Sequence, residues 1–242
     1  MTVFGRKPVL EALTDDRLTV DKVIVADTAR GPAVRDIVDA AQRRGVPVSR
    51  ATAHRVKVLA GNGKQDQGVL ADVVAPRMRR LSDALAGRAP RRVLLLDGIT
   101  TPANVGMILR TATAAGVHGI VVPRRGVAGI DPLVIKASAG VAFQAPVLRC
   151  ATAAEAAGDL RAAGYPLYGL DAGARQSLFT ADLPDRAAFV LGGETSGVTA
   201  DVRRHVNRWV SIPMSADVES LNVASAAAVL CFELVRRFHP NG

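Results

Sequence analysis

The chain has 242 residues, of which 49% are hydrophobic, 22% charged and only 4% aromatic. A chain of this size and apolar content can build one large domain or two smaller ones without disulfide staples. No apolar run reaches the roughly 18 residues that a membrane span requires, and the first residues lack the apolar core of a signal peptide. The composition therefore argues against a membrane protein or a disulfide-rich secreted scaffold, and we expect a cytoplasmic protein.

The net charge is positive and unevenly distributed. Thirty-one Lys and Arg against 22 Asp and Glu give +9. Residues 1–90 contribute 16 basic and 10 acidic side chains, net +6, and residues 91–242 contribute 15 and 12, net +3. This excess indicates a polyanionic partner, most simply nucleic acid, although an arginine-rich proteome would produce it too. Because aromatic residues are scarce, we expect any such contact to depend on charge and shape rather than on base stacking.

The two cysteines, Cys150 and Cys231, lie in apolar contexts and lack the spacing of a metal or redox site. They are therefore predicted to be buried free thiols, as is usual in a reducing compartment.

The first 75 residues alternate between short helical and strand patterns. The predicted helices cover 8–13, 33–44 and 54–59, and the predicted strands cover 22–26, 46–49 and 69–74. This alternation predicts a small α/β domain over residues 1–75. The polar, glycine-rich loop 61–68 cannot form a core, and it is a candidate contact surface.

Residues 76–92 differ in composition from both flanks. They hold six arginines together with Gly87 and Pro90. We interpret this segment as an Arg-rich linker with at most one helical turn, and as the domain boundary.

Residues 93–242 form the second predicted domain, where strand and helix patterns alternate. The predicted strands cover 93–96, 119–122, 166–170, 188–191 and 209–212; the predicted helices cover 105–115, 152–163, 200–206 and 221–238. Such alternation predicts a mostly parallel sheet covered on both faces. In open α/β sheets, ligands bind beyond the carboxyl ends of the strands, so the loops after strands are the candidate sites.

The first candidate loop leads into the helix that carries Arg110. Asn104 is predicted to cap this helix, whose N-terminus is suited to an anion such as phosphate. The ordinary alternative is a routine cap with a solvated arginine.

The second loop, Gly192-Gly193-Glu194-Thr195-Ser196-Gly197, follows an apolar strand. Its glycines permit positive φ and a close backbone approach to a flat ligand. It matches neither a dinucleotide fingerprint nor a phosphate-binding P-loop. An ordinary turn remains the alternative.

The third loop joins Ile212-Pro213-Met214 to Ser220-Leu221-Asn222, with Asp217 and Glu219 between them. It leads into a helix with almost no polar face, which must pack in a core or against a second chain. Ser220 and Asn222 then lie beside backbone groups without helical partners, where one of them could simply be a cap.

Together and in this order, the three loops closely resemble the SpoU/TrmH family of RNA 2′-O-ribose methyltransferases, part of the SPOUT superfamily. The motifs are Asn104-x-Gly106-x-x-x-Arg110, Gly192-x-Glu194-x-x-Gly197 and the two triplets of the third loop. Residues 1–75 are similar to the substrate-binding domain of the bacterial 23S rRNA guanosine branch, which itself resembles ribosomal protein L30e. Phe4-Gly5-Arg6-Lys7-Pro8 and Gln67-Gly68-Val69 carry that similarity.

The resemblance implies an α/β protein with an L30e-like N-terminal domain and a parallel-sheet SPOUT domain that contains a trefoil knot. It also implies a homodimer, RNA as the partner, most simply rRNA, and S-adenosyl-L-methionine as the cofactor. The residues that it assigns to cofactor binding are Gly192, Gly193, Ile212, Met214 and Leu221.

The catalytic residues that the resemblance implies are Asn104, Arg110, Glu194, Ser220 and Asn222. The family assigns activation of the ribose 2′-hydroxyl to the arginine, often across the subunit interface. Because arginine has a pKa above about 12, we expect Arg110 to clamp the target phosphate and position the hydroxyl rather than to act as a base.

Other functions compatible with the sequence are a tRNA methylase, an antibiotic-resistance methylase of the ribosome, and a non-catalytic RNA-binding assembly factor. A dinucleotide-dependent oxidoreductase fits poorly, since the glycine fingerprint and its acidic ribose partner are absent.

Overall fold

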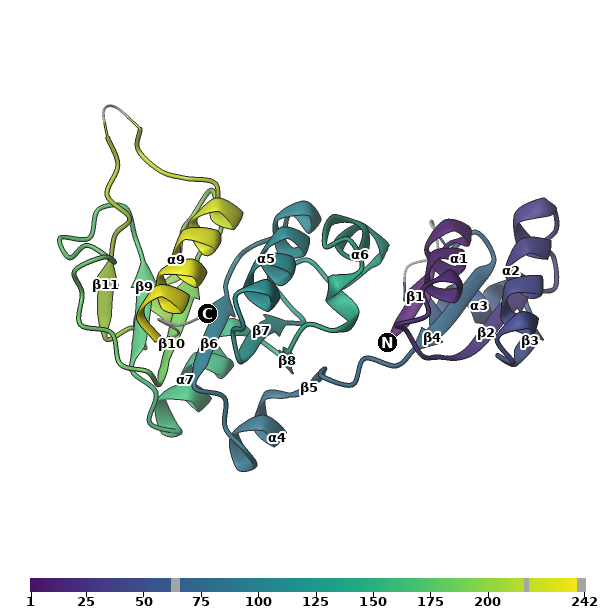
Figure 1. Ribbon diagram of the computed structural model, residues 1–242, viewed down its shortest axis with the longest axis horizontal. Coiled ribbons are helices and arrows are strands. Elements are labelled where there is room, and N and C mark those ends of the chain that lie inside the picture. Colours follow the sequence, from purple (N-terminus) through teal and green to yellow (C-terminus); the bar gives the residue numbers. More distant parts are fainter. Residues whose placement is uncertain (62–65, 216–217, 239–242) are drawn as a thin grey trace. The chain divides into compact units, whose positions relative to one another are not determined.

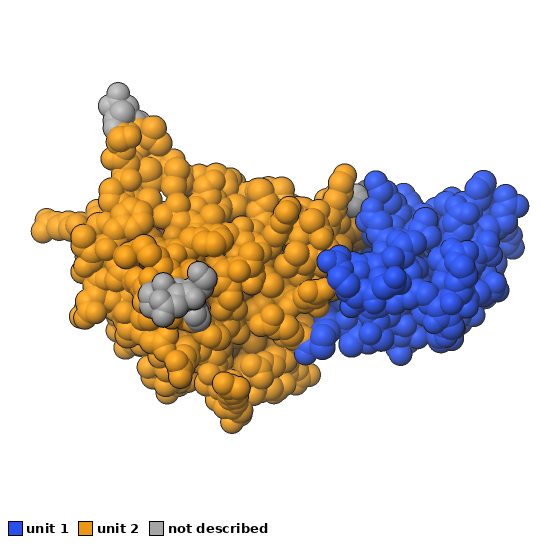
Figure 2. All heavy atoms as spheres, in the orientation of Figure 1, with its two compact units in different colours: residues 1–76 blue, residues 77–242 orange. Residues whose placement is uncertain are grey.

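The computed structural model describes residues 1–61, 66–215 and 218–238. They fall into two units, Met1–Pro76 and Arg77–Gly242 (Figures 1 and 2). Two sequence-based expectations extend outside the described residues: positions 62–65 of the predicted contact loop, and Asp217 of the third candidate loop.

Unit 1 is a four-stranded sheet with three helices. Its elements are β1 (Thr2–Phe4), α1 (Arg6–Thr14), β2 (Val20–Ala26), α2 (Pro32–Arg43), β3 (Val48–Ala51), α3 (Ala53–Leu59) and β4 (Val69–Val73). The strand order is β1-β4-β2-β3, with β4 antiparallel to both neighbours and β2 parallel to β3. The prediction missed only β1, whose three residues are too few to show an alternating pattern.

Unit 2 alternates strands and helices, as predicted. Its elements are β5 (Arg79–Arg80), α4 (Leu81–Ala86), β6 (Arg92–Leu96), α5 (Pro102–Ala114), β7 (Gly119–Pro123), α6 (Pro132–Ala137), the 3₁₀ turn η1 (Val141–Phe143), β8 (Val147–Cys150), α7 (Ala153–Ala162), β9 (Leu167–Leu170), β10 (Ala187–Leu191), α8 (Ala200–Arg203), β11 (Arg208–Val210) and α9 (Val223–Phe238).

The sheet of unit 2 has the order β11-β9-β10-β6-β7-β8-β5, and every neighbouring pair is parallel. All residues of β6, β7 and β10 are buried, as expected for strands covered on both faces. Helices α5 and α9 lie side by side over one face, whereas α7 lies on the other (Figure 1). The predicted parallel sheet is confirmed.

Residues 77–92 form part of unit 2 and are not the linker that the composition suggested. Strand β5 pairs with β8 at the edge of the sheet, and α4 buries Leu81 and Ala84 in the core beside Leu148 and Leu160. Because arginines dominate the local composition, the helical spacing of these few apolar residues was not recognised.

Helix α6 and strand β8 were also missed. Asp131 accepts hydrogen bonds from the backbone N–H groups of Leu133 and Val134, and Pro132 follows it at the first helical position. This Asp-Pro pair is a helix-start signal that the sequence does contain. No helix in the described part of the chain combines the length and apolarity needed to cross a membrane.

Candidate active site

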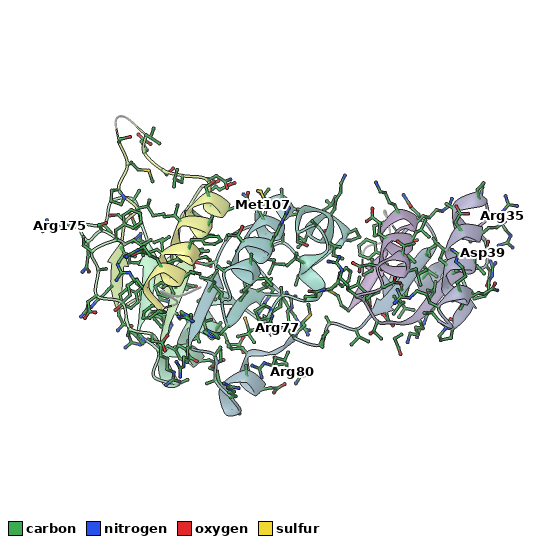
Figure 3. The ribbon with its side chains drawn as sticks, viewed as in Figure 1. Arg35, Asp39, Arg77, Arg80, Met107 and Arg175 are labelled. Atoms are coloured by element: carbon green, nitrogen blue, oxygen red, sulfur yellow. The ribbon has the colours of Figure 1, made fainter. Side chains whose placement is uncertain are left out.

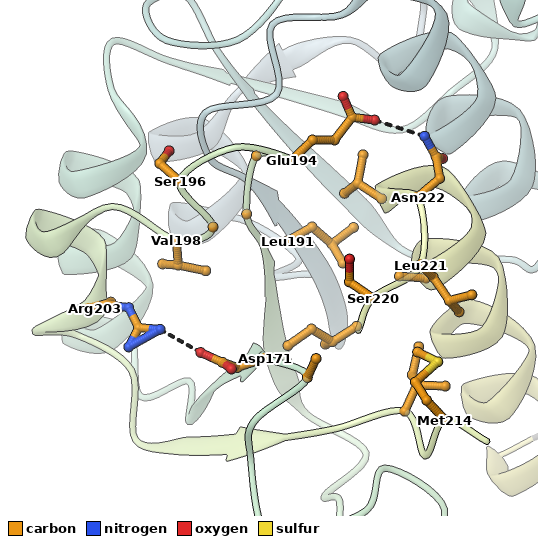
Figure 4. A pocket seen from close by; sticks show the side chains of 18 residues that line it. Asp171, Leu191, Glu194, Ser196, Val198, Arg203, Met214, Ser220, Leu221 and Asn222 are labelled. Atoms are coloured by element: carbon orange, nitrogen blue, oxygen red, sulfur yellow. Dashed lines mark hydrogen bonds and ion pairs between the residues drawn. The ribbon is translucent and has the colours of Figure 1, made fainter. Parts of the chain in front are cut away.

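A cavity of about 560 Å³ lies at the carboxyl ends of β9, β10 and β11 (Figure 4). Its walls come from the residues after these strands and from the start of α9. Its volume lies in the range of ordinary small-molecule sites. All five predicted cofactor-binding residues line it, namely Gly192, Gly193, Ile212, Met214 and Leu221.

The glycine loop after β10 is closed by backbone contacts. Gly193 and Gly197 exchange hydrogen bonds of 3.0 and 2.9 Å. A Cβ atom on Gly192 would lie 2.3 Å from the Gly197 carbonyl carbon, and one on Gly193 would lie 2.3 Å from the Gly98 oxygen. Only Gly197 of these three loop glycines has a positive φ, of 62°. The first two positions therefore require glycine because backbone approaches backbone.

Apolar side chains form the facing walls of the cavity. Leu191, Val198, Ile212 and Leu221 all contribute (Figure 4). Leu221 is still 37% exposed. A flat ligand could be held between these walls and the glycine loop, with its hydrogen bonds supplied mainly by the backbone.

Three predicted side chains meet at one end of the cavity. Asn222 Nδ2 donates to Glu194 Oε1 at 2.8 Å (Figure 4) and to Asn104 Oδ1 at 3.2 Å. Asn104 Nδ2 donates to the same Glu194 oxygen. We refer to Asn104, Glu194 and Asn222 as the amide–carboxylate cluster. It ties the three loops together, because each loop contributes one member.

Asn222 has two roles in this geometry. Its Oδ1 accepts a hydrogen bond of 2.9 Å from the backbone N–H of Ala224, so it caps α9 while its amide group serves the cluster. Asn104 does not cap α5, contrary to the prediction. The N-cap residue is Thr101, and Asn104 lies in the first turn with its side chain turned to Glu194.

Ser220 lines the cavity, but Arg110 does not. Arg110 is exposed on α5. It lies one helical turn after Met107, which is labelled in Figure 3, and therefore on the same face of the helix. Within one chain, the structure therefore brings Asn104, Glu194, Ser220 and Asn222 to this site and leaves Arg110 outside it.

Two charged residues of the cavity were not predicted. Asp171 follows β9, and it forms an ion pair of 2.5 Å with Arg203 on α8 (Figure 4). The Arg203 guanidinium lies 4.3 Å from the centre of the Trp209 ring. The strand-end rule that selected the other loops could also have found Asp171, whereas Arg203 has no local signal.

Both predicted free thiols are free. Cys231 is buried and Cys150 half-buried. Burial raises the pKa of Cys231 to about 12 and that of Cys150 to about 11. Neither thiol is ionised at neutral pH, so neither is a nucleophile for this site.

Comparison with known proteins follows the same division of the chain. Residues 91–232 match the model of the SpoU rRNA Methylase family. The chain belongs to this family. Residues 2–79 match a second family model, described as RNA 2′-O ribose methyltransferase substrate binding.

Full-length relatives carry both regions. The chain is 36% identical over 241 residues to the 23S rRNA (guanosine-2′-O-)-methyltransferase RlmB of Xanthomonas axonopodis pv. citri, covering 97% of this chain and 96% of that protein. It is 33% identical over 239 residues to RlmB of Ralstonia nicotianae, covering 97% and 95%. The crystal structure of the SpoU methyltransferase AviRb from Streptomyces viridochromogenes, in complex with AdoMet, matches with a TM-score of 0.65 at 25% identity and covers 100% of this chain and 91% of that one.

Proposed function

We propose that this protein is an S-adenosylmethionine-dependent RNA methyltransferase that methylates the ribose 2′-hydroxyl of a guanosine in 23S rRNA. The observation that carries the proposal is the meeting of the glycine loop, the apolar walls and the amide–carboxylate cluster in one cavity. The two RlmB relatives, similar along almost their whole length, support the rRNA guanosine as substrate.

The cavity fits the proposed donor. Close packing of backbone at Gly192 and Gly193 leaves peptide groups, rather than side chains, to face the ligand. Ile212 and Leu221 offer apolar walls for a flat ring. When bound, S-adenosylmethionine supplies an electrophilic methyl group on a sulfonium sulfur.

The residues of the amide–carboxylate cluster order the loops around the reacting groups. Glu194 accepts from two amides, which fixes the glycine loop relative to the starts of α5 and α9. The Arg110 guanidinium is suited to bind the target phosphate and orient the 2′-hydroxyl. Near-normal turnover of an Arg110→Lys variant would count against this role.

In this proposal, Arg110 of one chain lies beside the cavity of a second copy of the chain. Helices α5 and α9 pack side by side, and they expose Met107 (41%) and Phe232 (53%) to solvent. Large apolar side chains exposed together on the outer face of two helices are typical of a subunit interface. A homodimer through this face would cover them and carry Arg110 toward the partner's cavity.

The dimer is tested by the mass in solution. Phe232→Asp should convert a dimer to a monomer in size-exclusion chromatography with light scattering, because it buries a charge in the interface. Phe179→Asp is the control, because Phe179 is also exposed (44%) but lies outside α5 and α9. This change should leave the mass unchanged. A wild-type monomer, or a Phe232→Asp dimer, would contradict this interface.

Three further features accompany the proposal. We expect unit 2 to contain the trefoil knot of the family, since Ile212, Met214 and residues 220–222 share one cavity with residues after β9 and β10. We expect unit 1 to bind RNA as an L30e-like domain, a role supported by its substrate-binding family match. We also expect the protein to act in the cytoplasm, where ribosomes are assembled.

The reaction is tested by incubating the protein with methyl-labelled S-adenosylmethionine and either in vitro transcribed 23S rRNA or total tRNA. The expected result is label in 23S rRNA, released by nuclease digestion as 2′-O-methylguanosine. Label confined to tRNA would support the tRNA alternative, and label on a base would contradict the proposed reaction. Mapping 2′-O-methyl sites in rRNA from cells with and without the gene then identifies the nucleotide.

A further inference from the structure

The edge of the unit 2 sheet gathers arginines from three segments. Arg79 and Arg80 form β5, and Arg80 is paired directly with Arg149 of β8. Like charges directly opposite one another on neighbouring strands are destabilising. This pair therefore disfavours the fold unless something else compensates its charge.

Two more arginines join this edge from the end of β7. The backbone N–H of Arg124 donates to the Cys150 carbonyl at 3.1 Å, and that of Arg125 donates to the Ala151 carbonyl at 3.2 Å. These bonds hold the loop after β7 against the end of β8. Burial and the positive charge of Arg124 both lower the pKa of Arg149, with burial the larger cause. Arg80, Arg124 and Arg149 thus raise the positive potential of one small region, which we call the arginine edge.

No carboxylate in the described part of the chain forms an ion pair with the arginine edge, nor with Arg79 or Arg125. Other arginines of unit 2 do have acidic partners: Arg91, Arg92, Arg203, Arg204, Arg236 and Arg237. Further arginines of unit 2, among them Arg110, Arg161 and Arg208, also form no ion pair with the described residues. What distinguishes the arginine edge is therefore that its members lie together at one edge of the sheet.

Arg149 is the most constrained member. Its Nη1 is shielded from solvent and has no acceptor among the described residues. Leaving a charged donor in this state is unfavourable. The acids of α7, Glu155 and Asp159, act on Cys150, whose side chain points to the opposite face of β8 from that of Arg149. Because Arg149 as a whole is only half-buried, an anion beside its side chain would offset the burial of its charge.

We propose that the arginine edge binds backbone phosphates of the RNA substrate, as a second RNA contact separate from the substrate-binding unit. Guanidinium groups match phosphate oxygens in a bidentate geometry. Since the described segments at this edge present no aromatic ring, contact is with the backbone and carries no base preference. The inference rests on the proposed RNA substrate and extends it to a surface of the catalytic unit.

The test measures binding of in vitro transcribed 23S rRNA over a range of KCl concentrations. Arg80→Gln/Arg124→Gln removes two exposed charges and leaves the half-buried Arg149 in place. The control, Arg161→Gln/Arg208→Gln, removes two exposed arginines from the end of α7 and the start of β11. The edge variant should lose about two units of the slope of log K against log[salt], and about 10- to 100-fold in affinity at 0.1 M salt. The control should keep the wild-type slope.

Two comparisons make the result decisive. Arg80→Lys/Arg124→Lys should keep most of the slope, because counterion release follows charge. Equal slopes for the edge variant and the control would overturn the proposal. Gln variants that self-associate without losing RNA affinity would also overturn the proposal. In that case the charges on the edge strand would serve only to prevent strand pairing between molecules.

Failure of this inference is distinguishable from failure of the proposed function. If the wild-type protein methylates 23S rRNA and the edge variant binds RNA as the control does, only the proposal for the arginine edge is contradicted. If the wild-type protein transfers no methyl group but the edge variant still loses RNA affinity, only the proposed reaction is contradicted.

Discussion

Two polar clusters of unit 2 differ in how far their hydrogen bonds are satisfied. In the amide–carboxylate cluster, Asn222 uses both ends of its side chain, and Glu194 accepts from two amides. At the arginine edge, Arg149 keeps a shielded N–H without an acceptor. A satisfied network fixes geometry before a ligand arrives, whereas an unsatisfied one gains its partner only on binding. The first suits alignment of reacting groups and the second suits capture of a polyanion.

This contrast predicts that the two clusters can be broken separately. Changes around the cavity should lower the affinity for S-adenosylmethionine or the rate of methyl transfer, and they should leave the affinity for RNA unchanged. Changes at the arginine edge should do the reverse.

The largest effect is expected from Gly192→Ala. Its Cβ would lie 2.3 Å from backbone atoms of Gly197 and Val198, so the loop that walls the cavity must move. We expect donor binding to fall below detection in calorimetry with S-adenosylmethionine, while affinity for 23S rRNA stays near wild type. Gly129→Ala is the matched control, because no atom lies within 4 Å of the added carbon. Normal donor affinity in Gly192→Ala would mean that the loop does not form the donor site.

The next effect is expected from Glu194→Gln. A glutamine of the same shape brings an NH₂ group toward the amides that now donate to Glu194, so the loops lose their common anchor. Misplacement of reacting groups by about 1 Å can reduce the rate about 100-fold. We expect such a fall in single-turnover methyl transfer, with little change in affinity for donor or RNA. A rate within threefold of wild type would show that the cluster does not align the reaction.

A smaller and more selective effect separates the two roles of Asn222. Asn222→Ser keeps a side-chain oxygen of the kind that caps helices but loses the amide donor, and Asn222→Ala loses both. Methyl transfer should slow in both variants, whereas only the alanine variant should lose the roughly 1 kcal/mol that a cap supplies. Thermal unfolding measures the second quantity. Full activity in Asn222→Ser would leave Asn222 as a helix cap only.

The smallest effect concerns Glu233, a buried carboxylate on α9. Hydrogen bonds from Arg236, and then from Arg237, lower its pKa despite the opposing effect of burial. A lowered folded-state pKa adds stability above the unfolded value, near 4.5, and this stability is lost as the pH falls. Glu233→Gln should therefore reduce the melting temperature at pH 7 and narrow its difference from wild type near pH 3. An unchanged difference at both pH values would contradict this assignment.

The sequence predicts those parts of the site that depend on local order along the chain. Gly192, Ile212 and Leu221 line the cavity, and they were named in advance because the loops that hold them resemble the motifs of the family. The Asn104–Glu194 bond joins residues 90 positions apart, and no local pattern distinguishes it from an ordinary cap. This is why the local pattern wrongly made Asn104 the N-cap of α5, a position that Thr101 occupies.

Composition misled the interpretation where charge and core share one segment. In residues 77–92, arginines surround the few residues that enter the core, Leu81 and Ala84. A short edge strand also needs its partner, β8, before its pairing can be recognised. The exposed position of Arg110 has a different reason in the proposed dimer, because a contact with a second chain has no local pattern in the sequence of one chain.

Complementation between two inactive variants tests most directly whether the arginine of one chain completes the cavity of its partner. Arg110→Ala lacks the arginine and Gly192→Ala lacks a functional cavity, so each homodimer should be inactive. Co-expressed chains should form mixed dimers in which one of the two sites is intact, giving about one quarter of wild-type methyl transfer to 23S rRNA. Activity no higher than that of the separate parents would contradict the account.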